Sequence, residues 1–309
     1  MNARNKALMN ARNKSLQKNF PHLAITVLFA ITVAVAFSVI IVPNILAYGL
    51  QNPKREPIFE PIWYAGNGLV AHAGGGIEGE QYTNSLEALE YNYSKGIRAF
   101  EVDLIFSSDC KLVCRHDWGL DAYLRFKQAY NSVDPIMSLN VFKNTKITGK
   151  FKPMTASDLI NFLNKHQDIY IITDFKNENS FVYRSSVIEL LNEIKKVDPR
   201  LIDRIIWQIY SKENLADLNS VYKVNTEHII FCLYMNPMKY SSYDIFNWMI
   251  HNKINVLGLS ESFYNSDKTL VKQLLNYGIK TYVFTINDKT IHKELKKNYV
   301  FGVYTDMLY

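Results

Sequence analysis

Two acidic side chains stand two residues apart in the apolar segment AFEVDL, residues 99–104. On a β-strand, alternate side chains share one face, so Glu101 and Asp103 point the same way. Two carboxylates on one buried face lose hydration and repel each other, which is costly without a partner. A divalent cation removes this conflict, and an all-oxygen ligand set favours Mg²⁺, Ca²⁺ or Mn²⁺. A structural network in which lysines pair with these carboxylates is the alternative that the spacing leaves open.

The same spacing recurs at Asp174 and Lys176, in the apolar segment 169–176. Asp174 would complete a three-carboxylate site, and Lys176 would point to the same rim and hold an anionic oxygen of a substrate. An ion pair between these two residues is the alternative, although parallel neighbours on one strand are expected to pair poorly.

Two histidines also follow apolar segments. His72 follows residues 68–71 and precedes Ala73 and three glycines, and His116 lies in the motif RHDW, which follows the short apolar segment beginning at 111. Imidazole titrates near neutral pH, so two histidines beside a metal-bound phosphate can act as general base and general acid. We expect the glycines at 74–76 to let the loop pass close to a bulky anionic substrate, because they carry no Cβ.

Apolar β-rich segments and helical segments alternate along the rest of the chain. Eight such β segments predict a (β/α)8 barrel of parallel strands, an α/β fold in which catalytic groups meet at the carboxyl ends of the strands. An open doubly wound sheet is the alternative, disfavoured because no GxGxxG motif follows the first strand. The expected strands lie in 68–72, 99–104, 169–176, 204–210, 228–235, 255–261, 280–287 and 301–306, and the expected helices in 84–95, 156–166, 183–197, 244–252 and 267–277.

Further polar side chains follow apolar stretches near the ends of the predicted strands. Gln208, Thr285 and Asn287 are the candidates that we expect to contact a substrate in a shared polar pocket. Residues 118–154 separate the second and third barrel strands and are too long for a simple loop. We interpret them as an insertion over the rim, a candidate lid within a barrel domain at 68–309.

The N-terminal region has a different composition. Residues 1–20 carry five basic and no acidic side chains, and 23–42 carry no charge. Twenty apolar residues are enough to cross a bilayer as a helix. We therefore predict a basic cytoplasmic tail at 1–20, a single transmembrane anchor at 21–48, a linker at 49–67 and an extracytoplasmic barrel. A cleaved secretory signal is the alternative. Since the remainder of the chain is close to neutral, nucleic acid is not an expected partner.

Taken in order, these motifs resemble those of the glycerophosphodiester phosphodiesterase family over residues 68–309. The family's opening His-Arg-Gly, its Pro-Glu-Asn-Thr helix start, its Glu-x-Asp strand, its segment ending in His-Asp, its Glu-x-Lys strand and its closing strands all have counterparts. The counterparts are His72–Gly74, Tyr82–Ser85, Glu101–Asp103, Asp109–Asp117, Asp174–Lys176, Thr285–Asn287 and Gly302–Asp306.

The resemblance implies a barrel with a small insertion after the second strand and one divalent cation, Ca²⁺ or Mg²⁺. Glu101, Asp103 and Asp174 would hold this cation, and His72 and His116 would be the acid–base pair. Lys176 would bind phosphate, and Asn84 matches a further substrate-contacting motif. In the family's usual scheme, a neighbouring hydroxyl of the substrate attacks phosphorus, and water then opens the cyclic phosphate.

Ala73 departs from the family pattern, because it stands where the family has a phosphate-gripping arginine. We therefore expect a phosphodiester substrate other than a simple glycerophosphodiester, such as a larger lipid or a surface glycan. Two alternatives remain open. One is a phospholipase D-like enzyme or lyase that stops at the cyclic phosphate, and the other is a non-catalytic barrel that binds a phosphorylated ligand.

Overall fold

The structure is a computed structural model that describes residues 68–177, 179–233 and 242–307. The predicted tail at 1–20, anchor at 21–48 and linker at 49–67 lie outside these residues and stay predictions. Within the described ranges, no helix combines the length and the apolar character that a membrane crossing requires.

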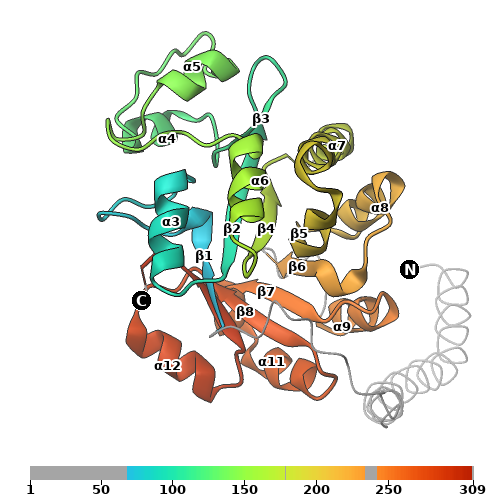
Figure 1. Ribbon diagram of the computed structural model, residues 1–309. Coiled ribbons are helices and arrows are strands. Elements are labelled where there is room, and N and C mark those ends of the chain that lie inside the picture. The colour runs from blue at the N-terminus through green and yellow to red at the C-terminus, as the bar shows by residue number, and fades with distance from the viewer. Residues whose placement is uncertain (1–67, 178, 234–241, 308–309) are drawn as a thin grey trace, which may run out of the picture. The chain divides into compact units, whose positions relative to one another are not determined.

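Eight parallel strands close into a barrel, which confirms the predicted fold class (Figure 1). The first barrel strand pairs with the second on one side and with the last on the other, so the ring of eight strands is closed. All eight coincide with segments predicted from the sequence. They are β1 (Leu69–Ala71), β2 (Ala99–Phe106), β4 (Tyr170–Phe175), β5 (Ile205–Ile209), β6 (Ile229–Leu233), β7 (Val256–Ser260), β8 (Lys280–Phe284) and β9 (Gly302–Thr305).

A ninth strand, β3 (Leu112–Cys114), folds back on β2 in antiparallel register. Leu104 pairs with Cys114, and the backbone N–H of Arg115 donates a hydrogen bond of 3.0 Å to the carbonyl oxygen of Asp103. This hairpin returns the chain to the carboxyl end of β2, so that His116 is placed beside the carboxylates of that strand.

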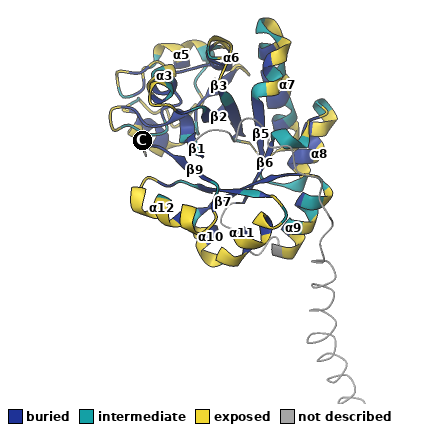
Figure 2. Cartoon of the chain, turned by 60° about the horizontal axis from the view of Figure 1, so that its bottom comes forward, coloured by how far each residue is buried: buried dark blue, intermediate teal, exposed yellow. Residues whose placement is uncertain are grey.

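Helices cover the outside of the barrel and turn their buried faces towards the strands (Figure 2). The helices predicted from the sequence are present, and α8, α10 and α12 join them. The helices around the barrel are α3 (Leu86–Ser94), α6 (Ala156–Lys165), α7 (Ser180–Val197), α8 (Lys212–Val221), α9 (Ser242–His251), α10 (Glu261–Ser266), α11 (Lys268–Leu275) and α12 (Lys289–Lys297), with short 3₁₀ turns at His72–Gly74, Pro199–Arg204 and Thr226–His228.

Alternation along each strand divides the side chains between two cores. On β2, Phe100, Val102 and Leu104 belong to the large core between strands and helices. On the opposite face of the sheet, Ile172 of β4, Ile206 of β5 and Ile230 of β6 belong to a second cluster inside the barrel. Further towards the carboxyl ends, that inner face carries polar side chains instead, so the barrel has an apolar base and a polar mouth.

Residues 118–154 form two short helices, α4 (Leu120–Arg125) and α5 (Leu139–Asn144). They have a small core of their own, which contains Trp118, Tyr123 and Phe142. The buried guanidinium of Arg115 lies 4.7 Å from the ring centroids of both Trp118 and Tyr123 and donates to the carbonyl oxygen of Asp117. These contacts fix the segment to the hairpin that carries His116.

We predict that Gly302→Ala destabilises the seam that closes the barrel. A Cβ at this position would lie 2.2 Å from the carbonyl oxygen of Gly68 and 2.5 Å from Cε1 of Tyr282. Such overpacking typically costs about 1–3 kcal/mol of unfolding free energy, measurable by urea denaturation. The exposed Lys297→Ala should change stability by no more than about 0.5 kcal/mol. Equal stability of the Gly302 variant and the wild type would refute the tight seam.

Candidate active site

A pocket opens at the carboxyl ends of the barrel strands. Its lining combines imidazole, carboxylate, ammonium, amide and aromatic side chains from both halves of the chain. The residues are His72, Tyr82, Glu101, His116, Asp174, Lys176, Gln208, Tyr210, Phe284 and Tyr304.

Three buried carboxylates converge at this pocket. Glu101 and Asp103 share the inner face of β2, and Asp174 is the register partner of Asp103 on β4. One oxygen from each of the three lies within 4.8 Å of the other two. The strand register therefore produces the cluster that the two-residue spacing predicted.

The donor set fits a hard divalent cation. Buried oxygens Oε1 of Glu101 and Oδ1 of Asp174 have no hydrogen-bond partner among the described residues. Oδ1 of Asp103 also lacks a well-directed hydrogen bond, although it lies 2.7 Å from Nζ of Lys176. Burial and the neighbouring charge of Asp103 raise the pKa of Glu101 to about 8. Oxygen ligands left unsatisfied in a cluster of like charge are what Mg²⁺ or Ca²⁺ would bind.

Lys176 partly neutralises this cluster. Its ammonium forms ion pairs with both Asp103 and Asp174, so the expectation that Asp174 and Lys176 would pair poorly is wrong. The lysine side chain is long and flexible enough for its ammonium to reach both carboxylates. The expectation considered only the parallel directions of the two side chains at the backbone. Burial lowers the pKa of Lys176, but the charges of Asp103, Asp174 and Glu101 outweigh it, and the pKa rises well above its usual range. Lys176 is thus a fixed positive charge at the pocket.

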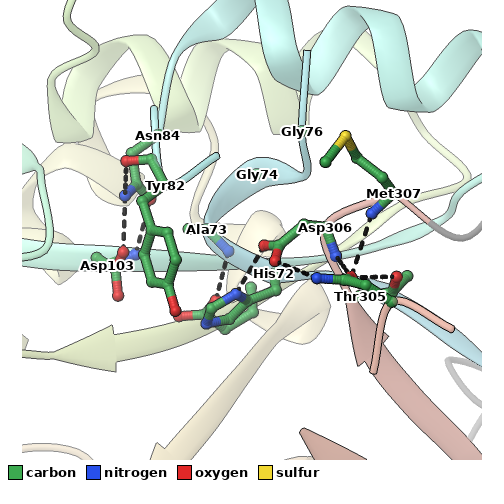
Figure 3. Close-up of polar contacts among 12 residues, drawn as sticks. His72, Ala73, Gly74, Gly76, Tyr82, Asn84, Asp103, Thr305, Asp306 and Met307 are labelled. Carbon is green, nitrogen blue, oxygen red and sulfur yellow. Dashed lines mark hydrogen bonds and ion pairs between the residues drawn. The ribbon is translucent and has the colours of Figure 1, made fainter. Parts of the chain in front are cut away.

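His72 is oriented by a carboxylate from the other end of the chain. Its Nδ1 lies 2.9 Å from Oδ1 of Asp306 (Figure 3). The amide of Asn287 donates to the second oxygen of Asp306 at 2.8 Å. Burial lowers the pKa of His72, but the hydrogen bond to Asp306 and the charges of Glu101, Asp306 and Asp103 raise it to about 8. Asn287, predicted as a substrate contact, lies where it holds Asp306.

His116 has a carboxylate partner too. Its Nδ1 lies 2.8 Å from Oδ2 of Asp117, the next residue in the chain. The ring of Tyr82 stands edge-on to both imidazoles, with centroid distances of 4.8 Å to His72 and 5.6 Å to His116. Two imidazoles, each with Nδ1 engaged by a carboxylate, therefore flank one tyrosine at the pocket wall.

The glycines of the loop after His72 serve close packing within the protein, and their predicted approach to a substrate stays a prediction. A Cβ on Gly75 would lie 2.3 Å from the amide of Asn92, and one on Gly76 would lie 2.7 Å from Met307. The glycines let the loop pack against α3 and the chain end. Ala73 has the left-handed backbone angle φ of 49°, and its N–H donates to Oε2 of Glu101 at 2.7 Å, which orients that carboxylate.

The other predicted substrate contacts differ in position. Asn84 is buried, and its amide both donates to Asp103 at 2.7 Å and accepts from the Asp103 N–H at 3.0 Å. Gln208 lines the pocket between two tyrosines, accepting from Tyr304 and donating to Tyr210. Thr285 follows β8 and is not among the residues that line this pocket. Direct contact of these residues with a substrate stays a prediction.

Sequence reasoning missed several residues of the site. Asp117 and Asp306 hold the two histidines, and Tyr82, Tyr210 and Tyr304 shape the pocket. Asp306 was recognisable as a polar strand end and Asp117 as the neighbour of His116. Nothing in the local sequence around Tyr82 indicates that its ring lies between both imidazoles.

Comparison with known proteins finds one matching family and several solved structures with a similar fold. The model of the glycerophosphoryl diester phosphodiesterase family matches residues 75–308. Similar solved structures include a glycerophosphodiester phosphodiesterase from Parabacteroides distasonis (TM-score 0.61, 17% identity, 78% of this chain and 93% of that one). A second, from Thermotoga maritima, has TM-score 0.58 and 20% identity over 78% and 95% of the two chains. A third, an Oleispira antarctica phosphodiesterase in complex with the product sn-glycerol-3-phosphate, has TM-score 0.62 and 16% identity over 79% and 95%.

Among curated proteins, the chain is similar to the UvrABC system protein C of Mesoplasma florum. The identity is 31% over 119 residues, which is 35% of this chain and 20% of the relative. The chain thus spans about a fifth of that relative's length, and the match carries no argument about activity.

Cation binding can be tested directly by titration calorimetry with Ca²⁺ and Mg²⁺. Replacing Asp174 by Asn should weaken binding by about tenfold or more, because one of three anionic ligands is lost. Asp168→Asn, which alters an exposed ion pair with Arg98, is the matched control and should bind as the wild type does. Equal affinity in the Asp174 variant and the control would argue against the site.

The effect of Asp306 on the pKa of His72 can be measured by NMR titration of the cation-free protein. Asp306→Asn removes the negative charge beside Nδ1, which is one cause of the raised pKa, so the pKa of His72 should fall below about 8 while the charges of Glu101 and Asp103 remain. The His72 Cε1 proton reports this shift. A pKa unchanged by the substitution would mean that Asp306 does not set the charge of the imidazole.

Proposed function

The chain belongs to the glycerophosphoryl diester phosphodiesterase family, a family of phosphoric diester hydrolases, and we propose that it hydrolyses a glycerophosphodiester-type substrate with one divalent cation. One observation carries this proposal. Two imidazoles, each engaged by a carboxylate, face the same pocket as a cluster of three buried carboxylates. The groups needed for proton transfer and for charge stabilisation at a phosphodiester therefore share one cavity.

We propose that His72 and His116 exchange protons with the substrate. One imidazole takes the proton of a neighbouring substrate hydroxyl while its oxygen bonds to phosphorus, and the other gives a proton to the oxygen whose bond to phosphorus breaks. Water then opens the cyclic phosphate with the two roles exchanged, so that the products are the released alcohol and a phosphomonoester. Lys176 supports a phosphate oxygen with its positive charge. The cation held by Glu101, Asp103 and Asp174 would supply further positive charge to the non-bridging oxygens. Asp117 and Asp306 keep the two imidazoles in position.

Two observations support a proposal about the nature of the substrate. The similar Oleispira protein was solved with sn-glycerol-3-phosphate as its product, which supports a glycerophosphodiester-type substrate here. Ala73 supplies no cation to the phosphate. A different cationic side chain lies beside the pocket wall: the guanidinium of Arg125 on α4 is 4.6 Å from the ring centroid of Tyr82. We propose that Arg125 binds an anionic group beyond the scissile phosphate, in keeping with a larger lipid or glycan substrate.

For the whole chain, we propose a single-pass membrane protein. The apolar segment 23–42 and the basic residues before it support a cytoplasmic N-terminus and a barrel domain outside the membrane. This arrangement would place the pocket where phosphodiesters of lipids or surface glycans occur.

The reaction is tested with the full chain on a panel of glycerophosphodiesters and glycans, with Ca²⁺ or Mg²⁺ present. His72→Ala and His116→Ala should each lower kcat by about 10²–10⁴-fold, with unchanged thermal unfolding, and EDTA should stop turnover. Phosphorus NMR identifies the product as a phosphomonoester or a cyclic phosphate. Full activity in both histidine variants would sink the proposal.

The role of Arg125 is separable from catalysis. Arg125→Gln should raise KM for substrates with an anionic group beyond the phosphate, with kcat nearly unchanged. Substrates without such a group should be hydrolysed as by the wild type. Arg200→Gln, an exposed arginine paired with Asp198, is the control. A KM increase of the same size for both substrate classes would rule out this selectivity.

A further inference from the structure

The segment 118–154 exposes large apolar side chains. Leu120 and Leu124, one turn apart on α4, are 47% and 64% exposed, and Val133 in the following loop is 92% exposed. Val141 on α5 is 49% exposed. Six of the fifteen large apolar side chains that are exposed among the described residues lie in this segment, and a concentration of exposed apolar surface commonly marks a binding surface.

This exposure is not a consequence of a poorly packed segment. α4 and α5 bury their inner residues Tyr123 and Phe142 in a core with Trp118. Ala122 and Phe126 pack into a second cluster that ties α4 to the barrel side. The apolar side chains that face outwards are therefore additional to those that the fold requires.

The charge of the segment is opposite to that of the surrounding barrel. Residues 118–154 contain six basic and two acidic side chains, a net charge of +4. The rest of 68–309 contains 22 basic and 25 acidic side chains, a net charge of −3. Arg125, Lys127, Lys143 and Lys146 are exposed and lie near the apolar side chains in sequence.

The segment stands on the side of the barrel where the pocket opens. In Figure 1, α4 and α5 lie beyond the carboxyl end of β2, on the side of the β2–β3 hairpin. Arg125 contacts Tyr82 of the pocket wall. Two further exposed apolar residues follow strands on this side, namely Phe181 after β4 and Met307 after β9. Apolar side chains thus occur at several points around the pocket.

We propose that the outer face of α4, the 130–136 loop and α5 rests on a lipid bilayer that contains anionic headgroups, with the pocket turned towards the lipid. Apolar side chains would enter the boundary of the hydrocarbon, and the surrounding lysines would contact anionic headgroups. A protein partner is disfavoured, because lysine is depleted at protein–protein interfaces. This surface extends the proposed function, and its binding requires no turnover.

The test places an environment-sensitive nitrobenzoxadiazole label on the surface. Cys110 is the exposed cysteine among the described residues, while Cys114 and Cys232 are buried, so Cys110→Ser provides a background for labelling. Leu124→Cys carries the label in the full chain, reconstituted into nanodiscs of phosphatidylcholine alone or with phosphatidylglycerol. Ile188→Cys on α7, which replaces an apolar residue outside the segment that is 47% exposed, is the matched control.

At position 124 the fluorescence should shift to the blue and increase in nanodiscs with phosphatidylglycerol, and high salt should weaken the shift. Position 188 should show neither change. Lys127→Glu, Lys143→Glu and Lys146→Glu combined should abolish the shift at 124 while the thermal unfolding transition is retained. This measurement is independent of hydrolysis, so a failed activity assay leaves it interpretable.

Three outcomes would overturn the proposal. The label at 124 stays in an aqueous environment in both lipids, or positions 124 and 188 shift equally, as in adsorption without a defined surface. In the third, the shift at 124 grows with protein concentration in detergent without any bilayer, which would assign the surface to a second copy of the chain.

Discussion

Three carboxylates and one ammonium share the mouth of a barrel whose base is apolar. Removing charged groups from water is unfavourable unless each finds a partner. In this site the protein provides partners for some of the carboxylate oxygens but not for all of them. Lys176 pairs with Asp103 and Asp174, and Glu101 accepts from the N–H of Ala73. Much of the surrounding structure serves this balance. The left-handed turn at Ala73 aims an N–H at Glu101, and the buried Asn84 secures Asp103 on two sides. A divalent cation would complete the arrangement, because single oxygens of Glu101 and Asp174 accept no hydrogen bond from the described residues.

Much of the fold could be predicted from the sequence, because it depends on repeated local patterns. Each barrel strand is a short apolar run bounded by turns, and each strand end that turns polar marks the same rim. The antiparallel pairing of β3 and the helices α8, α10 and α12 were not anticipated. β3 has three residues and α10 six, and α12 carries only two large apolar side chains, Ile291 and Leu295, so short or sparse apolar patterns did not mark these elements.

The site was predictable to the extent that its spacing is local. Glu101, Asp103, Asp174 and Lys176 follow from two-residue spacing and parallel strands. The partners of the histidines do not, since Asp306 lies 234 positions from His72 and meets it only when the barrel closes. The pairing of Lys176 with Asp174 and the packing role of the glycines depend on side-chain reach and on neighbours distant in sequence, which local patterns do not describe.

The pairing of β9 with β1 links closure of the barrel to completion of the site. Asp306, which holds His72, directly follows β9, and β9 pairs with both β1 and β8. If β9 separated from β1, the carboxylates of β2 and β4 and the hairpin that carries His116 would stay together, but Asp306 would leave His72. The contact between Asp306 and His72 therefore reports whether the barrel is closed, and a chain with an opened seam would keep its carboxylate cluster but lose the anchored imidazole.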